Sequence, residues 1–251
     1  PAFTVGDLGD ASDATPGDGS CATAAATCTL RAAVEEANAL AGPSAVTITF
    51  ASDGTVYWTG GPIVVTASVD ISGAGHHVVL DGRSCAGCSD PKQLFRLTNA
   101  AASFHLARLE LANGATPSVN GGAAIEIVAG TASVDDVTFF QHTATAAPGG
   151  AVAVLGGSFT ARNPTFVGNS ASSGADVYNA GGSVMLKQAT LWHAVGGSVA
   201  NLDSAGGNLQ LANAIVDPTS GRSCTGSVMA FTVLSSDGTC GGAAVAPQLG
   251  T

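Results

Sequence analysis

Five segments of this sequence can be aligned on one another, and their spacing constrains the fold more than any other feature. Successive segments are offset by 28, 27, 25 and 25 residues. In each segment the first and third positions are apolar or small, the fifth is mostly polar, and the eighth is always apolar. The segments are 104–111, 132–139, 159–166, 184–191 and 209–216. A period of about 25 residues that holds short strands and no helix is typical of one coil of a parallel β-helix.

The fifth positions of these segments are predicted to stack at a turn of the coil. Asn and Asp side chains favour turns because they hydrogen-bond to nearby backbone groups. Gly pairs precede several segments, and Gly adopts backbone conformations that side chains forbid. The fifth positions are Arg108, Asp136, Asn163, Gln188 and Asn213. We therefore predict an all-β solenoid of about six or seven coils, similar to that of pectate lyases.

One more coil is predicted before the first segment, with Ile71 stacked on Leu106. The interval between these two residues is 106 − 71 = 35, which exceeds the period. Residues 81–90 are predicted to loop out and absorb the excess.

The composition agrees with a folded solenoid and excludes other classes. Gly accounts for 34 of the 251 residues, charged residues for only 10% and hydrophobic residues for 45%. Disordered chains combine low hydrophobicity with high charge, and this chain has neither. The formal net charge is −10, whereas nucleic-acid-binding proteins carry clusters of Lys and Arg that bind phosphates. No nucleic-acid partner is therefore predicted. No apolar run approaches the length of about 18 residues that indicates a transmembrane segment.

One amphipathic helix is predicted near the start of the chain, over residues 29–41. Thr29 is a suitable N-cap, and Gly42-Pro43 ends the pattern. The apolar face consists of Leu30, Ala33, Val34, Ala37 and Leu40. Such a helix is suited to cover the N-terminal end of a solenoid, because an uncovered terminal coil is an aggregation edge. We predict one domain over residues 1–251, with an N-terminal cap at 1–45, coils at 46–220 and a disulfide-stapled end at 221–251.

Six cysteines fall into three local pairs, a pattern that favours disulfides and an oxidising compartment. The pairs are Cys21 with Cys28, Cys85 with Cys88, and Cys224 with Cys240. Six cysteines allow many connectivities, so the pairing of neighbours is a hypothesis. A zinc site at residues 85–88 would need a second CxxC or a nearby HxxxH motif to complete four ligands, and neither is present. The adjacent His76 and His77 are a weak metal signal that more often marks a surface loop. The chain starts at Pro1 without a signal peptide, which we interpret as a mature secreted form or a trimmed chain.

Several short motifs resemble those of secreted bacterial proteins. Residues 16–21 (PGDGSC), 28–33 (CTLRAA) and 36–38 (EAN) resemble the N-terminal "CSLREA" motif, with Ala32 where the family has Glu. Residues 166–171 (FVGNSA) are similar to the FxxN element of polymorphic outer membrane protein repeats. The resemblance implies a right-handed parallel β-helix with an N-terminal capping α-helix. It also implies secretion or surface display by a Gram-negative-type bacterium.

Some ionisable residues are predicted to gather on one side of the coils. A polysaccharide lyase needs a base and a cation, and a glycosidase needs two carboxylates that flank the scissile bond. Adjacent coils lie about 4.8 Å apart, which allows residues from successive segments to meet. The candidate catalytic residues are Arg108, Glu110, Asp135, Asp136 and His142. The alternative interpretation is structural, with Arg108 and Asp136 as a surface ion pair at a turn.

Two aromatic residues, Phe140 and Trp192, follow the inward eighth position by one residue. They are either exposed rings on which a sugar stacks or core residues just past a bend. With Lys187 and His193 they form the set of candidate binding residues. The N-terminal Asp7, Asp10, Asp13 and Asp18 raise the question of calcium, but they lack the ligand spacing of known calcium motifs. A turn-rich, solvated segment is therefore favoured, and no cofactor is predicted.

Two functions are compatible with these features. The first is a secreted or cell-surface module whose Thr-, Ser- and Asn-lined sides bind glycans or protein partners, as adhesin passengers do. The second is a polysaccharide lyase or glycoside hydrolase that uses the cluster at 108–142. Fold alone does not decide between them.

Overall fold

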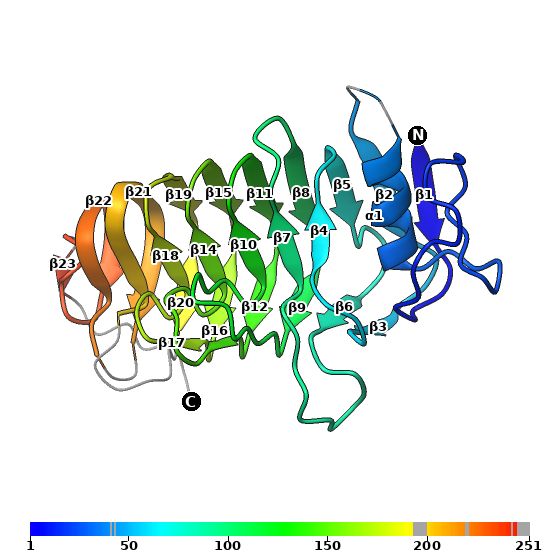
Figure 1. The fold of residues 1–251 in the computed structure, drawn as a ribbon. Coiled ribbons are helices and arrows are strands. Elements are labelled where there is room, and N and C mark those ends of the chain that lie inside the picture. The colour runs from blue at the N-terminus through cyan, green and yellow to red at the C-terminus, as the bar shows by residue number, and fades with distance from the viewer. Residues whose placement is uncertain (41, 43, 193–199, 219–220, 242, 245–251) are drawn as a thin grey trace.

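The strands stack along one axis, and each pairs in parallel with the equivalent strand of the next coil (Figure 1). The computed structural model describes residues 1–40, 42, 44–192, 200–218, 221–241 and 243–244. Three columns of strands result, which we call A, B and C in the order in which the chain visits them. The fold is the parallel β-helix that the repeat predicts. No helix in the described part of the chain is long and apolar enough to cross a membrane.

Each column is one face of the solenoid. Column A consists of β1 (Ala2–Val5), β2 (Val46–Phe50), β5 (Val69–Ser72), β8 (Ser103–Ala107), β11 (Thr131–Asp135), β15 (Ser158–Arg162) and β19 (Ser183–Lys187). Column B consists of β3 (Gly54–Tyr57), β6 (Val78–Asp81), β9 (Glu110–Ala112), β12 (Thr138–Phe140), β16 (Thr165–Val167) and β20 (Thr190–Trp192). Column C consists of β4 (Ile63–Val65), β7 (Phe95–Leu97), β10 (Ile125–Ile127), β14 (Val152–Val154) and β18 (Val177–Asn179).

The last coils are built differently from the central ones. The long strands β21 (Leu202–Asp217) and β22 (Cys224–Ser235) run through all three columns without a break. The short strand β23 (Ala243–Ala244) pairs with the end of β22 in column B. A separate two-residue pair, β13 (Thr143–Ala144) and β17 (Ser170–Ala171), follows column B at the corner toward column C.

The strand register confirms the alignment of the five segments. Their first positions stack in column A, and their eighth positions stack in column B. Ile71 lies against Leu106, as predicted for the preceding coil. Inward side chains form one continuous core along the axis, in which the rings of Phe139 and Phe166 stack at 4.6 Å. A period set by apolar positions therefore fixes the register, because a shift of one residue would turn every inward side chain outward.

The fifth positions form a ladder of left-handed residues at the corner between columns A and B. Their φ angles lie between 53° and 55° at Arg108, Asp136, Asn163, Gln188 and Asn213. Few L-residues adopt this conformation at low cost, and Asn and Asp are the usual exceptions to that rule. The predicted turn column is thus a column of identical backbone conformations.

Helix α1 (Leu30–Ala39) takes the place of a column C strand before the first coil. Thr29 is its N-cap and accepts a hydrogen bond from the Ala32 backbone N–H at 3.1 Å, as predicted. The helix ends at Ala39 rather than at residue 41, because Leu40 is already extended before Gly42. The Asn38 side chain then completes the edge of β4, donating to Val64 O at 2.7 Å and accepting from the N–H groups of Thr66 and Ala67.

All six cysteines are paired with their predicted neighbours, as Cys21–Cys28, Cys85–Cys88 and Cys224–Cys240. The second disulfide closes the loop at residues 82–92 that projects between β6 and β7, as predicted for the longer interval (Figure 1). The third joins the start of β22 to the segment that follows it. Disulfides of this kind are typical of proteins in oxidising compartments.

Candidate functional site

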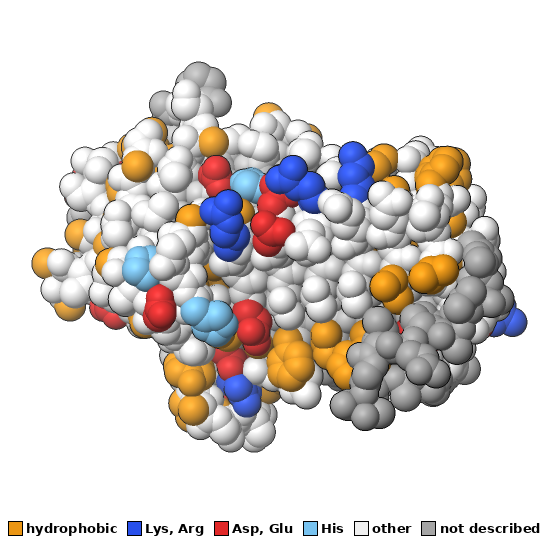
Figure 2. Space-filling model, turned by 180° about the vertical axis from the view of Figure 1, so that it is seen from behind, with side chains coloured by type: hydrophobic (Ala, Val, Ile, Leu, Met, Phe, Trp, Pro, Cys, Tyr) orange, Lys and Arg blue, Asp and Glu red, His pale blue; other side chains and the backbone are white. Residues whose placement is uncertain are grey.

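A row of charged side chains crosses the outer face of column A. His105 Nδ1 lies 2.9 Å from Asp70 Oδ1, and His105 Nε2 lies 3.3 Å from Asp135 Oδ2. The guanidinium of Arg162 binds both oxygens of Asp135 at 2.9 Å. We call Asp70, His105, Asp135 and Arg162 the charged row. Figure 2 shows Asp, His, Lys and Arg side chains gathered on this side of the molecule, with an otherwise mostly uncharged surface around them.

The register explains the charged row. Asp70 and His105 are paired across β5 and β8, and Asp135 and Arg162 are paired across β11 and β15. All four side chains are partly exposed. An imidazole between two carboxylates is suited to proton transfer, but each group here is already bound to a neighbour. Exposed ion pairs of this type contribute about 0–1 kcal/mol each to stability.

The five candidate catalytic residues do not converge on one site. Asp135 belongs to the charged row, whereas Arg108 and Asp136 are exposed at the left-handed corner. Asp136 Oδ1 accepts a hydrogen bond from Asn163 at 2.9 Å, which is a contact along the turn ladder. Glu110 is partly buried on β9, where it stacks on Thr138. The predicted cluster is therefore reduced to Asp135 and its partners.

His142 is a buried structural residue, and its assignment to the cluster is wrong. It lies past column B, where Nδ1 accepts from the Gly114 N–H at 3.0 Å and Nε2 lies 2.9 Å from Leu111 O. Burial lowers the pKa of His142 to about 4, against a smaller opposing effect of the Leu111 carbonyl. The sequence placed this residue only by its distance from Asp136 along the chain, and the bend between columns turns it inward.

The candidate binding residues occupy separate places. Phe140 and Trp192 share one outward row of column B and are partly buried. They are therefore neither fully exposed rings for sugar stacking nor part of the core. Lys187 is exposed at the end of β19, in register with Arg162. His193 lies outside the described residues.

A groove runs along the corner between columns B and C, against the disulfide-closed loop at 82–92. Its main part has a volume of about 600 Å³. The lining residues are Arg83, Cys88, Ser89 and Pro91 from the loop, and Asn113, Gly114, Ala115, Gln141, Thr143, Gly168 and Ser170 from three successive coils. Two hollows of about 460 and 390 Å³ share Pro91 and Ala115 with it and extend it toward residues 116–118 and 145–146.

The groove wall repeats from coil to coil. Asn113, Gln141 and Gly168 form a second left-handed ladder, with φ angles of 52°, 54° and 68°. Beside it, Thr143 pairs with Ala115 on one side and Ser170 on the other. Amide and hydroxyl groups are therefore presented at the spacing of adjacent strands, about 4.8 Å.

The cations beside the groove are each bound to an acid. Arg83 binds the buried carboxylate of Asp81, with Nε at 2.9 Å from Oδ1, and this hydrogen bond raises the pKa of Arg83. Asn113 Nδ2 donates to the same carboxylate at 3.0 Å. Lys92 Nζ lies 3.2 Å from Asp90 Oδ2. The groove thus combines apolar surface with amide and hydroxyl groups and has no strong net charge. The sequence pattern did not indicate this groove, because its walls come from loops of different coils.

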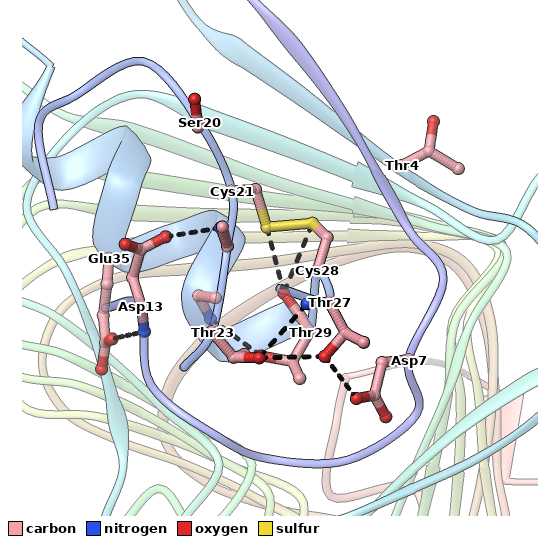
Figure 3. Close-up of a disulfide and its surroundings, with 12 residues drawn as sticks. Thr4, Asp7, Asp13, Ser20, Cys21, Thr23, Thr27, Cys28, Thr29 and Glu35 are labelled. Atoms are coloured by element: carbon pink, nitrogen blue, oxygen red, sulfur yellow. Dashed lines mark hydrogen bonds between the residues drawn. A yellow bond between two sulfur atoms is a disulfide. The ribbon is translucent and has the colours of Figure 1, made fainter. Parts of the chain in front are cut away.

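The N-terminal acidic residues stabilise the cap loop around Cys21–Cys28 (Figure 3). Asp7 accepts from Thr27 at 2.7 Å, and Asp13 accepts from the Ala22 N–H at 3.1 Å. Asp10 binds Arg31 of α1 at 2.8 Å. Within the described residues, no group of three or more His, Cys, Asp or Glu side chains is arranged to hold a metal ion.

Comparisons of the chain with protein families, with curated proteins and with solved structures found no significant match. The surface geometry therefore has to indicate the function by itself.

Proposed function

We propose that this protein is an extracellular or cell-surface binding module whose groove takes an uncharged glycan chain. One observation carries the proposal: the groove crosses three successive coils, with side-chain amides on the first two (Asn113 and Gln141) and hydroxyls on the last two (Thr143 and Ser170). A polysaccharide is also a repeating chain, and the strand spacing of about 4.8 Å is comparable with the length of one pyranose unit. Polar groups in fixed positions give orientation and specificity to such a site.

The charge pattern favours a neutral ligand. Arg83 and Lys92 are each paired with an aspartate, so an acidic polymer would find no free cation in these positions. The net charge of −10 would also repel an acidic polymer at a distance. The three disulfides and the earlier resemblance to secreted β-helix proteins support the extracellular setting.

The test is titration of the protein with a panel of neutral and acidic polysaccharides by calorimetry. We expect a neutral glycan to bind without turnover, and we expect Gln141→Ala and Thr143→Ala each to weaken binding by about two- to tenfold, since each removes a hydrogen bond worth about 0.5–1.5 kcal/mol. Matched controls are Thr160→Ala and Gln210→Ala, which lie on the outer face of column A. Equal loss in controls and groove variants would overturn the assignment of the groove.

A second candidate function is cleavage of a polysaccharide at the charged row. It rests on the position of His105 between Asp70 and Asp135. Release of reducing ends or unsaturated products from the same panel, lost in His105→Gln and Asp135→Asn, would favour this enzyme over a pure binding module. If Gln141→Ala and Thr143→Ala still bound and cleaved the polysaccharide normally, the activity would lie on column A rather than in the groove.

A further inference from the structure

The three disulfides differ in how easily a reagent in solution reaches their sulfur atoms. Cys224–Cys240 is buried, with its residues 4% and 1% exposed. Cys21–Cys28 is partly buried and packs against the core. In the projecting loop at residues 82–92, by contrast, Cys85 is exposed and Cys88 is partly exposed (Figure 1). One of the three disulfides is therefore open to attack while the fold is intact.

The loop has a base that does not depend on its disulfide. Ser84 Oγ donates to Asp90 Oδ1 at 2.9 Å. The Lys92 N–H donates to Gly82 O at 2.7 Å. Residues 85–89, between these contacts, depend on the disulfide and on one backbone hydrogen bond of 3.1 Å between the same two cysteines. Cleavage of the disulfide would therefore release residues 85–89 and leave the base in place.

The released residues include part of the groove wall. Cys88 and Ser89 line the groove, as do Arg83 and Pro91 on either side of them. Arg83 is held by the buried carboxylate of Asp81, so it stays in place when the disulfide opens. The groove would lose the wall at residues 88–89 and keep the opposite wall, which the coils form.

We propose that Cys85–Cys88 is a thiol–disulfide exchange site whose redox state controls the groove wall at residues 88–89. The co-reactant is a dithiol. Exposed disulfides are reduced more readily than buried ones, because a thiolate has to reach a sulfur atom before it can react. The proposal concerns the disulfide and its loop, so it does not depend on which ligand the groove takes.

The exchange conserves electrons and protons. One thiolate of the dithiol attacks the sulfur of Cys85, the more exposed residue of the pair, and Cys88 leaves as a thiolate. The second thiolate of the dithiol then attacks the dithiol's own sulfur in the mixed disulfide and releases the Cys85 thiolate. The dithiol loses two electrons and two protons and leaves as a disulfide. The loop gains the same two electrons and two protons, and both of its cysteines become thiols.

Reduction at this site is expected to leave the coils folded. The constraint that a disulfide places on the unfolded chain grows with the length of the loop that it closes. Cys85–Cys88 joins residues three positions apart, whereas the other two disulfides span 7 and 16 positions. Loss of this disulfide therefore adds the least freedom to the unfolded chain.

The experiment treats the full chain with dithiothreitol, a small dithiol, and blocks new thiols with iodoacetamide at successive times. Peptide mass spectrometry then locates the blocked cysteines. We expect Cys85 and Cys88 to react at least about tenfold faster than the other four cysteines, which serve as internal controls. In the reduced chain, hydrogen exchange should become at least about tenfold faster at residues 85–89 and stay unchanged in the strands.

Two variants test the same change without a reductant. Cys85→Ser combined with Cys88→Ser should show the hydrogen exchange of the reduced chain and an unchanged circular dichroism spectrum. Ser89→Ala is the matched control, because it alters the groove wall but keeps the disulfide. It should show the slow exchange of the oxidised wild type.

Two results would overturn the proposal. Reaction of Cys21–Cys28 or Cys224–Cys240 before or together with Cys85–Cys88 would show that the loop holds no selective exchange site. Equal hydrogen exchange at residues 85–89 in the oxidised and reduced chains would show that other contacts hold the groove wall. Neither measurement involves a glycan, so a failure here is distinct from a failure of the proposed binding function.

Discussion

Single residues set the corners of this solenoid through their backbone conformation. The ladder that starts at Arg108 repeats one left-handed conformation in each coil through Asn213 and continues to Thr232 of β22, whose φ is 54°. A left-handed L-residue costs roughly 1–2 kcal/mol, and Asn and Asp bear it best because their side chains bond locally. The contact between Asn163 and Asp136 is an example of that compensation.

This conformation predicts the effect of a β-branched residue in the ladder. Gln188 is exposed and has a φ of 54°, so its substitution changes little besides the backbone preference. We expect Gln188→Val to lower the free energy of unfolding by about 1–2 kcal/mol, and Gln188→Asn to leave it unchanged or raise it. Urea unfolding of both variants measures the difference, and equal stability of the two would contradict a left-handed residue at this position.

Two buried titratable residues are joined through one amide at the corner after column B. Asn169 accepts from the His142 N–H at 2.9 Å and donates to Asp176 at 2.8 Å, while Asn201 donates to the same carboxylate at 2.6 Å. Burial raises the pKa of Asp176 to about 7, although both asparagine bonds act in the opposite direction. Burial lowers the pKa of His142 to about 4.

The two shifts predict opposite pH dependences. A raised carboxyl pKa contributes stability below about pH 4 that is lost as the pH rises to about 7. A lowered imidazole pKa contributes stability above about pH 6.5 that is lost as the pH falls to about 4. Between these limits each contributes a slope of about 1.4 kcal/mol per pH unit, and in the wild type the two slopes oppose each other.

Single variants should separate these slopes. Relative to the wild type, we expect Asp176→Asn to gain stability as the pH rises from 4 to 6.5, and His142→Gln to lose stability over the same range. Thermal unfolding at successive pH values provides the measurement. Parallel curves for the wild type and both variants would mean that these residues titrate alike in the folded and unfolded chains.

At the scale of elements, α1 ends column C, whereas columns A and B begin with the strands β1 and β3. Its apolar residues Leu30, Ala33 and Val34 are fully buried, and Asn38 bonds the edge of β4. The opposite side of the helix is bound by the N-terminal loop, since Glu36 accepts from the N–H groups of Gly17 and Gly19. The helix is thus held from both sides and closes column C without offering an edge.

A charge on the apolar face of α1 should open this end. We expect Leu30→Asp to lower the free energy of unfolding by at least about 3 kcal/mol, because it removes a buried leucine and buries a carboxylate without a partner. The exposed strand edges should then cause aggregation, which light scattering detects. Ala39→Lys, on an exposed position of the same helix, is the control, and equal solubility of both variants would contradict the capping role.

At the scale of the whole molecule, each coil gains its stability from the coils on either side. Val184 lies between Phe159 and Leu209, whereas Val233 in the last coil stacks on Ala214, and both valines are buried. In a solenoid, stability is a sum of coil terms and nearest-neighbour contacts. Among the described residues, the coil of β22 has a neighbouring coil along its whole length on one side only, so we expect it to be less stable than the central coils.

The same substitution should have different costs at these two places. We expect Val184→Ala to lower the free energy of unfolding by about 2–3 kcal/mol and Val233→Ala by about 1 kcal/mol or less. Denaturant unfolding of the two variants compares them directly. Equal costs would indicate that the last coil is as tightly packed as the central ones.

The repeat by itself determined the fold and its register, because apolar residues at fixed intervals have only one arrangement that buries all of them. The repeat also placed the turn ladder and the loop before its first segment, while local patterns indicated the Cys85–Cys88 pair and the helix after Thr29. These features depend on local chemistry and on a period, both of which are written along the chain.

Only the tertiary structure decided which polar residues meet. His142 has the same residue type as His105, yet a bend turns the former into the core and leaves the latter between Asp70 and Asp135. The groove likewise joins Arg83 to Gln141 and Ser170 across three coils and one projecting loop. Periodicity specifies which side chains point inward, but contacts among outward side chains depend on loop lengths and corners, which carry no period.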